Sequence, residues 1–125
     1  MSRKIRLATT CLRGQLRGTP EQACESLGAM LTAVWPQQPD IVCLPETFAT
    51  GAQGGRAKDH GQPVPGPITD YFAALARTHR TYIICPLLRC EEGRVFNSAV
   101  ILGRDGEIAG IYNKAHPVTC GSDFC

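Results

Sequence analysis

A short apolar run that ends beside a carboxylate is the feature that most constrains this chain. Residues 41–44 are apolar and partly β-branched, and they are bounded by Pro39 and Pro45, a pattern typical of a buried strand. Glu46 follows directly. Ligands of open α/β sheets gather at the carboxyl ends of the strands, so Glu46 stands where such folds carry their chemistry. It is therefore a candidate general base, and the alternative is a surface residue that caps the following turn.

The segments around this run predict an α/β fold. An alternating stretch at 5–12 predicts a first strand, and Thr19 with Pro20 predicts the start of a helix that Trp35-Pro36 ends. Strand, helix and the strand at 41–44 form a βαβ unit in a mainly parallel sheet. The remaining predicted elements are a helix opened by Gly66-Pro67, a strand at 81–88 that Pro86 should end or bulge, and an antiparallel hairpin formed by 95–102 and 107–113.

Composition narrows the class of protein further. The 125 residues suit one domain, and 43% hydrophobic with 19% charged residues is ordinary for a globular protein. A net charge of +2 without an aromatic-studded basic face argues against a nucleic-acid partner. No apolar stretch approaches the roughly 20 residues that cross a bilayer, so no membrane association is expected. Seven cysteines, several of them within apolar runs, predict reduced thiols and a cytoplasmic location.

Two further segments bear on a possible site. The stretch 52–67 is rich in Gly, Pro and polar residues, and we expect a long loop that rims a pocket on the Glu46 side. His116, Cys120 and Cys125 match no standard paired-ligand zinc spacing, so no metal is expected. The phosphate-binding glycine motifs and the G-x-S-x-G elbow are absent from the sequence, so no cofactor is expected either.

Three short motifs, taken together, carry a resemblance to a known family. They are Leu44-Pro45-Glu46 followed by Thr50-Gly51, then residues 95–100 (Val-Phe-Asn-Ser-Ala-Val), then residues 112–116 (Tyr-Asn-Lys-Ala-His). In order and spacing they resemble the nitrilase superfamily of carbon–nitrogen hydrolases. The resemblance implies a four-layer α-β-β-α sandwich, of which residues 1–125 would supply the N-terminal portion, with a mixed sheet and two main helices.

The family's chemistry is carried over residue by residue. Its members hydrolyse non-peptide C–N bonds of small amides, carbamoyl compounds or nitriles with a Glu, a Lys and a Cys, and they use no metal. Glu46 matches the general base and Lys114 matches the cation that stabilises the tetrahedral intermediate. Without the resemblance, Lys114 would be an ordinary solvated lysine. A small-molecule substrate is therefore expected, and the protein could also form a homo-oligomer, as members of this family commonly do.

The resemblance leaves the nucleophile unassigned. In the family it lies on a strand well downstream of the lysine, whereas Cys120 and Cys125 follow Lys114 too closely to match it. The chain is therefore expected to be truncated before the nucleophile, and this fragment itself is expected to be inactive. The competing hypothesis is a non-catalytic remnant that binds a small molecule or a partner chain through a half-built sheet.

Overall fold

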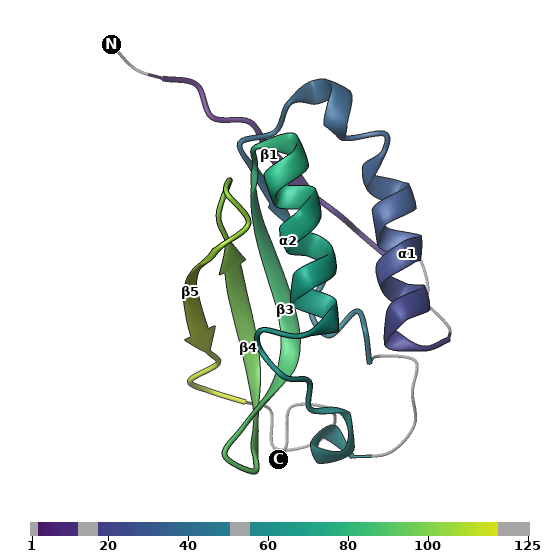
Figure 1. The fold of residues 1–125 in the computed structure, drawn as a ribbon, viewed down its shortest axis with the longest axis vertical. Coiled ribbons are helices and arrows are strands. Elements are labelled where there is room, and N and C mark those ends of the chain that lie inside the picture. The colour runs from purple at the N-terminus through teal and green to yellow at the C-terminus, as the bar shows by residue number, and fades with distance from the viewer. Residues whose placement is uncertain (1–2, 13–17, 51–55, 118–125) are drawn as a thin grey trace.

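The computed structural model of the chain describes residues 3–12, 18–50 and 56–117. It contains a five-stranded mixed sheet and two α-helices (Figure 1). The strands lie in the order β1 (Leu7–Thr9), β2 (Ile41–Cys43), β3 (Tyr82–Glu91), β4 (Arg94–Leu102) and β5 (Ile108–Asn113). β1, β2 and β3 are parallel to one another, while β3, β4 and β5 form an antiparallel meander. The predicted α/β class, the mixed sheet and the two main helices are confirmed.

The first helix begins as its sequence signals predict. α1 (Pro20–Leu31) has Thr19 as its N-cap, and the Thr19 hydroxyl accepts from the Gln22 backbone N–H while the Gln22 side chain accepts from the Thr19 N–H. The helix ends at Leu31, earlier than the predicted stop at Trp35-Pro36, which instead forms the short 3-10 helix η1 (Trp35–Gln37). The C-cap residue Thr32 turns its hydroxyl back to the Ala29 carbonyl, a bond that competes with continuation of the helix.

The second helix packs its apolar side chains into the core between the helices and the sheet. α2 (Pro67–His79) buries Ile68, Phe72 and Ala76 at helical spacing, as predicted, against buried residues of β2, β3 and β4. Phe72 is fully buried and meets the Phe48 ring edge-on, with ring centroids 5.5 Å apart. Phe48 comes two residues after Glu46, so the core directly anchors the segment that carries the candidate base.

Pro86 does not end or bulge its strand, which corrects the sequence-based prediction. β3 runs without interruption from Tyr82 to Glu91 and pairs with β4 from Ile83 to Glu91. The Leu44 N–H donates to the Ile84 carbonyl and the Gln62 N–H donates to the Leu88 carbonyl, both on the side away from β4. Pro86 shares this parity, so the N–H that proline lacks would have faced the side where β2 has already ended.

Two other predicted segments differ in extent. The first strand covers only Leu7–Thr9 of the predicted 5–12, because β2 offers just three residues to pair with it. The predicted loop at 52–67 contains the 3-10 helix η2 (Ala57–His60), and Gln62 forms a bridge with Arg89 of β3. Part of that loop, residues 52–55, lies outside the described residues, so its predicted role as a pocket rim stays a prediction.

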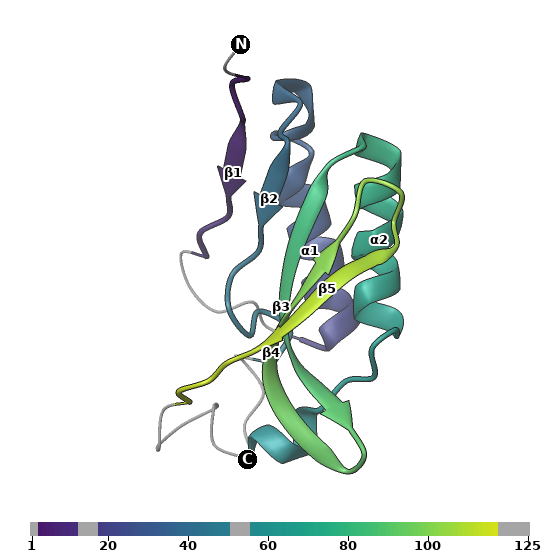
Figure 2. The ribbon, with the colours of Figure 1, turned by 90° about the vertical axis from the view of Figure 1, so that its left-hand side faces the viewer.

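Helices cover one face of the sheet, whereas large apolar side chains are exposed on the other. Both helices lie on one face, and Figure 2 looks onto the other. Val42, Ile83 and Val100 alternate toward the helices and are fully buried. On the opposite face, Leu7 and Tyr112 are 63% and 58% exposed. Helices long and apolar enough to cross a membrane are not found among the described residues.

Candidate active site

Three strand ends bring Glu46, Asn97 and Lys114 together. Glu46 follows β2, Asn97 lies near the start of β4, and Lys114 follows β5 directly. Glu46 Oε1 accepts a hydrogen bond from Lys114 Nζ at 3.0 Å and a second from Asn97 Nδ2 at 2.9 Å. Residues 46 and 114 are far apart in sequence, yet they form an ion pair at the carboxyl end of the parallel strands.

The chain around Glu46 is fixed on both sides. Leu44 precedes it, is buried, and extends the β2 ladder by donating its N–H to the Ile84 carbonyl. Thr47 follows it with a φ of 49°, a left-handed conformation that is rare for a β-branched residue and costs on the order of 1–3 kcal/mol. Phe48 then enters the core. Glu46 is thus held out of the fold between two buried anchors.

The lysine side of the pair is placed by the antiparallel meander. The Lys114 N–H donates to the Asn97 carbonyl at 2.8 Å and continues the β4–β5 ladder one residue past β5. Asn97 is 8% exposed and therefore has little freedom to move. A single residue of β4 consequently contacts both partners, since its carbonyl holds the Lys114 backbone and its amide holds the Glu46 carboxylate.

The geometry leaves one carboxylate oxygen available. Both donors bind Oε1, and Oε2 has no hydrogen-bond partner within the ranges that the structure describes. The Glu46 side chain is 57% exposed and that of Lys114 is 31% exposed, so the pair opens to solvent on one side. An oriented carboxylate with a free oxygen can accept a proton, and the neighbouring ammonium can stabilise negative charge on a bound molecule.

Sequence reasoning brought Glu46 and Lys114 to one site but missed the contact made by Asn97. The Asn97 amide donates to the Glu46 carboxylate, and the motif at 95–100 by itself names no such partner. The sequence signal that could have indicated this contact is the position of Asn97 within the motif at 95–100, between the start of a strand and apolar residues. A buried amide at such a position needs a partner, and the register that supplies Glu46 is a property of the assembled sheet.

The described cysteines include two that burial makes poor nucleophiles. Burial raises the pKa of Cys24 to about 11, and it also raises the pKa of Cys85 well above the ordinary thiol range. Neither of the two hydrogen-bond partners of Glu46 is a thiol. Cys120 and Cys125 lie outside the described residues, and within 3–12, 18–50 and 56–117 no group of three or more His, Cys, Asp or Glu side chains could hold a metal ion.

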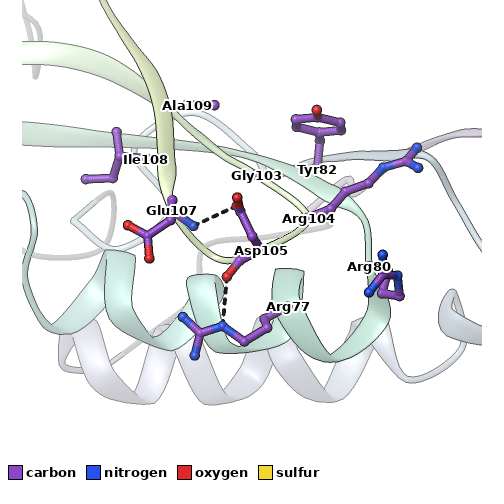
Figure 3. Close-up of a pocket in the computed structure, with 9 residues that line it drawn as sticks. All are labelled: Arg77, Arg80, Tyr82, Gly103, Arg104, Asp105, Glu107, Ile108 and Ala109. Atoms are coloured by element: carbon purple, nitrogen blue, oxygen red, sulfur yellow. Dashed lines mark hydrogen bonds between the residues drawn. The ribbon is translucent and has the colours of Figure 1, made fainter.

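A cleft lies at the opposite end of the sheet but lacks a comparable group of side chains. It has a volume of about 620 Å³ between the end of α2 and the β4–β5 turn. Arg104 Nη2 bonds Asp40 at 2.7 Å, and Arg77 Nε bonds the Asp105 carbonyl at 2.8 Å. Figure 3 shows the guanidinium groups of Arg77 and Arg104 pointing away from each other. They do not converge on one point in the cleft, as a site for a small anion would require.

Comparison with known proteins identifies the family of the chain. A family model described as carbon-nitrogen hydrolase matches residues 14–123. A β-ureidopropionase from Arabidopsis thaliana is 33% identical over 84 residues, which are 62% of this chain and 21% of that protein. The chain thus spans about a fifth of the curated relative.

Solved structures show the same fold. A carbon–nitrogen hydrolase from Helicobacter pylori G27 superposes with a TM-score of 0.76 at 24% identity, over 91% of this chain and 40% of that one. A CN-hydrolase superfamily protein from Xanthomonas campestris gives 0.74 at 27% identity, over 88% and 41%. An N-terminal amidase gives 0.75 at 20% identity, over 88% and 28%. The family model covers most of the sequence, and the chain belongs to the carbon–nitrogen hydrolase family.

Proposed function

We propose that this chain carries the acid–base and charge-stabilising half of a site that hydrolyses a non-peptide carbon–nitrogen bond. The observation that supports this proposal is the shared use of Glu46 Oε1 by Lys114 and Asn97, while Oε2, beside the ammonium group, has no hydrogen-bond partner among the described residues. An ordinary lysine in contact with solvent does not require a neighbouring carboxylate that a buried amide holds in place.

Glu46 is the proton carrier in this proposal. A thiol attacks the carbonyl carbon of the substrate, and Glu46 Oε2 accepts the thiol proton and returns it to the departing nitrogen. Glu46 then takes a proton from the water that cleaves the acyl-enzyme thioester. Asn97 donates to Oε1 throughout, so the carboxylate keeps Oε2 directed at the substrate. The thiol is not one of the hydrogen-bond partners of Glu46, and the proposal leaves its position open.

Lys114 acts on the charge that develops during these steps. Negative charge builds on the carbonyl oxygen as the tetrahedral intermediate forms, and an ammonium already held nearby stabilises it without reorganisation. The salt bridge to Glu46 holds the side chain in one place, and the Asn97 carbonyl holds its backbone. Removal of an electrostatic stabiliser of this kind typically lowers kcat about 10²–10³-fold.

The proposed substrate is a small amide, carbamoyl compound or nitrile. Similarity to a β-ureidopropionase favours a carbamoyl compound that carries a carboxylate.

Ammonia release from three substrates tests the proposal. Protein expressed from its complete reading frame is assayed with an N-carbamoyl β-amino acid, a small primary amide and a nitrile. We expect release from at least one of them, and loss of release in Glu46→Gln and in Lys114→Met. The 125-residue chain by itself is expected to release none.

Two results would contradict the proposal. Full activity in Glu46→Gln would show that Glu46 is not the general base. Ammonia release that persists in both variants would show that the reaction takes place elsewhere in the protein. Turnover by the 125-residue chain that is abolished by Cys120→Ser or Cys125→Ser would assign the nucleophile to a cysteine that the sequence analysis set aside. Asp40→Asn, at the far end of the sheet, is the matched control.

A further inference from the structure

Arg89 is a buried charge close to the candidate site that the proposed chemistry does not use. It lies on β3 and is 7% exposed, and in the described part of the chain it is the only formally charged residue that is buried. Burial of a guanidinium is unfavourable unless its charge and all of its donors are satisfied. Its position therefore calls for an explanation other than packing.

The Arg89 guanidinium spans three neighbours. Nη1 and Nη2 bond the two oxygens of Glu91 at 2.8 and 2.9 Å, and the group lies 5.2 Å from the centre of the Phe96 ring. Nη2 also donates to Asn113 Oδ1 at 3.3 Å. Asn113 Oδ1 accepts a second bond, from the Ser98 hydroxyl at 2.7 Å. Two side chains thus converge on the last residue of β5.

These contacts lie on the face of the sheet opposite to Lys114. Arg89 pairs with Phe96 and Ser98 pairs with Asn113, and all four share the face of Val100, which is buried beneath the helices. Side chains alternate along a strand, so the extended chain directs position 114 to the other face, where Asn97 also lies. Arg89 and Ser98 therefore hold the Asn113 side chain on the helix-covered face. The next residue, Lys114, bonds Glu46 on the other face.

Arg89 is not well satisfied by these contacts. Its Nε is buried without a hydrogen-bond partner in the described residues, and the unmet donor is a cost. Glu91 is 55% exposed and would be solvated without the arginine. A group that contributed only to stability would be served as well by an apolar side chain of similar size.

We propose that Arg89 is a positioning residue: from the helix-covered face of the sheet it holds Asn113, and so fixes the strand end from which Lys114 reaches Glu46. This inference rests on the proposed function, because it gives Arg89 its role through the Glu46–Lys114 pair. Arg89 itself touches neither reacting group. Its contribution is the restriction of motion at the end of β5, where the chain leaves regular structure.

The lysine content of the chain makes a direct test practical. The sequence has three lysines, Lys4, Lys58 and Lys114, so protein labelled with 15N-lysine gives three side-chain ammonium signals in NMR spectra. Lys114→Arg assigns the Lys114 signal by its disappearance. The quantity measured is the exchange rate of the Lys114 Nζ protons with water, which a persistent hydrogen bond to Glu46 slows.

Arg89→Met is the decisive variant. We expect its melting temperature to equal or exceed that of the unmodified chain, because an incompletely satisfied charge is replaced by an apolar side chain. We expect Lys114 Nζ exchange to become at least about five-fold faster, and faster still in the double variant with Ser98→Ala, which frees Asn113 from both donors. Arg94→Met removes the same charge from an exposed position on β4 and should change neither quantity.

Each alternative outcome has one meaning. If Arg89→Met lowers the melting temperature and leaves Lys114 exchange unchanged in the folded protein, Arg89 is structural and the inference is wrong. An equal acceleration in Arg94→Met would show a general charge effect and would also refute it. Glu46→Gln tests the proposed function separately from the role of Arg89. If this variant leaves Lys114 exchange unchanged, the Glu46–Lys114 ion pair is refuted, and the proposed function with it. If Glu46→Gln accelerates exchange and Arg89→Met does not, only the role of Arg89 falls.

Discussion

The two ends of the sheet each carry a carboxylate held by cations, and the two are held differently. At the amino end, Asp40 uses both oxygens: Oδ1 accepts from Arg3 and from Arg104, and Oδ2 accepts from the Arg6 backbone N–H at 3.0 Å. Its side chain is 16% exposed. At the carboxyl end, Glu46 has both donors on one oxygen and a side chain that is 57% exposed.

This difference separates a structural carboxylate from a candidate catalytic one. Asp40 ties the segment before β1 to the start of β2 and to the β4–β5 turn, so its acceptors are consumed by the fold. Glu46 is placed by the fold, but its Oε2 accepts no hydrogen bond from the part of the chain that the structure describes. Cleft volume alone would point to the amino end, where the cleft beside Arg104 measures about 620 Å³, but the guanidinium groups of Arg77 and Arg104 do not converge on one point there.

The largest expected contrast is catalytic. In protein with measurable hydrolase activity, Glu46→Gln should lower kcat about 10³-fold, because the amide keeps the shape of the side chain but cannot accept the proton. Asp40→Asn should change kcat by less than about three-fold, because Asp40 acts only through the fold. Steady-state kinetics with the best substrate of the panel measures both values. A comparable loss in Asp40→Asn would erase the distinction between the two ends.

Stability should show the reverse contrast. Asp40→Ala removes the shared acceptor of Arg3 and Arg104, and we expect a melting temperature several degrees lower. Glu46→Gln should change the free energy of unfolding by no more than about 0.5 kcal/mol, because the ion pair with Lys114 is partly solvated and such pairs are weak, while the amide oxygen can still accept from Asn97. Thermal unfolding followed by circular dichroism gives both values. A larger loss in Glu46→Gln would make the Glu46 ion pair structural.

Acid should weaken the amino end selectively. The Arg6 backbone N–H, followed by the Arg104 and Arg3 side chains, lowers the pKa of Asp40 below its ordinary value. A carboxyl with a lowered folded-state pKa contributes stability above its unfolded pKa, which is about 3.9, and loses it as the pH falls through the folded pKa. Urea unfolding at pH 6 and pH 3 should therefore show a smaller acid loss in Asp40→Asn than in the unmodified chain. An equal loss would show that other carboxyls account for it.

The smallest effect is expected within the cleft itself. Arg80 lines it, and its side chain forms no hydrogen bond or ion pair with the residues that the structure describes. Arg80→Gln should leave the free energy of unfolding within about 0.5 kcal/mol and kcat/KM unchanged, since exposed side chains without partners contribute little. Chemical unfolding and steady-state kinetics provide the check. A large loss of activity would bring the cleft back as a candidate site.

Local signals in the sequence were sufficient for most elements of the fold. The Thr19 capping box, the Gly66-Pro67 helix start and the 103–106 hairpin turn all act within a few residues, and all three were predicted correctly. Pro86 was misjudged because its tolerance depends on which side of β3 lacks a partner strand. That information belongs to the length of β2 and not to the residues around the proline.

The chain by itself determined that Glu46 follows a buried strand and that Lys114 follows the second strand of a hairpin, because period-two patterns and turn residues are properties of short segments. Only the tertiary structure decided that Lys114 and Asn97 both donate to Glu46 Oε1, and that Arg89 bonds Asn113 at the end of β5. The physical reason is strand register. A shift of one residue turns every side chain to the other face, so these contacts exist only in the assembled sheet.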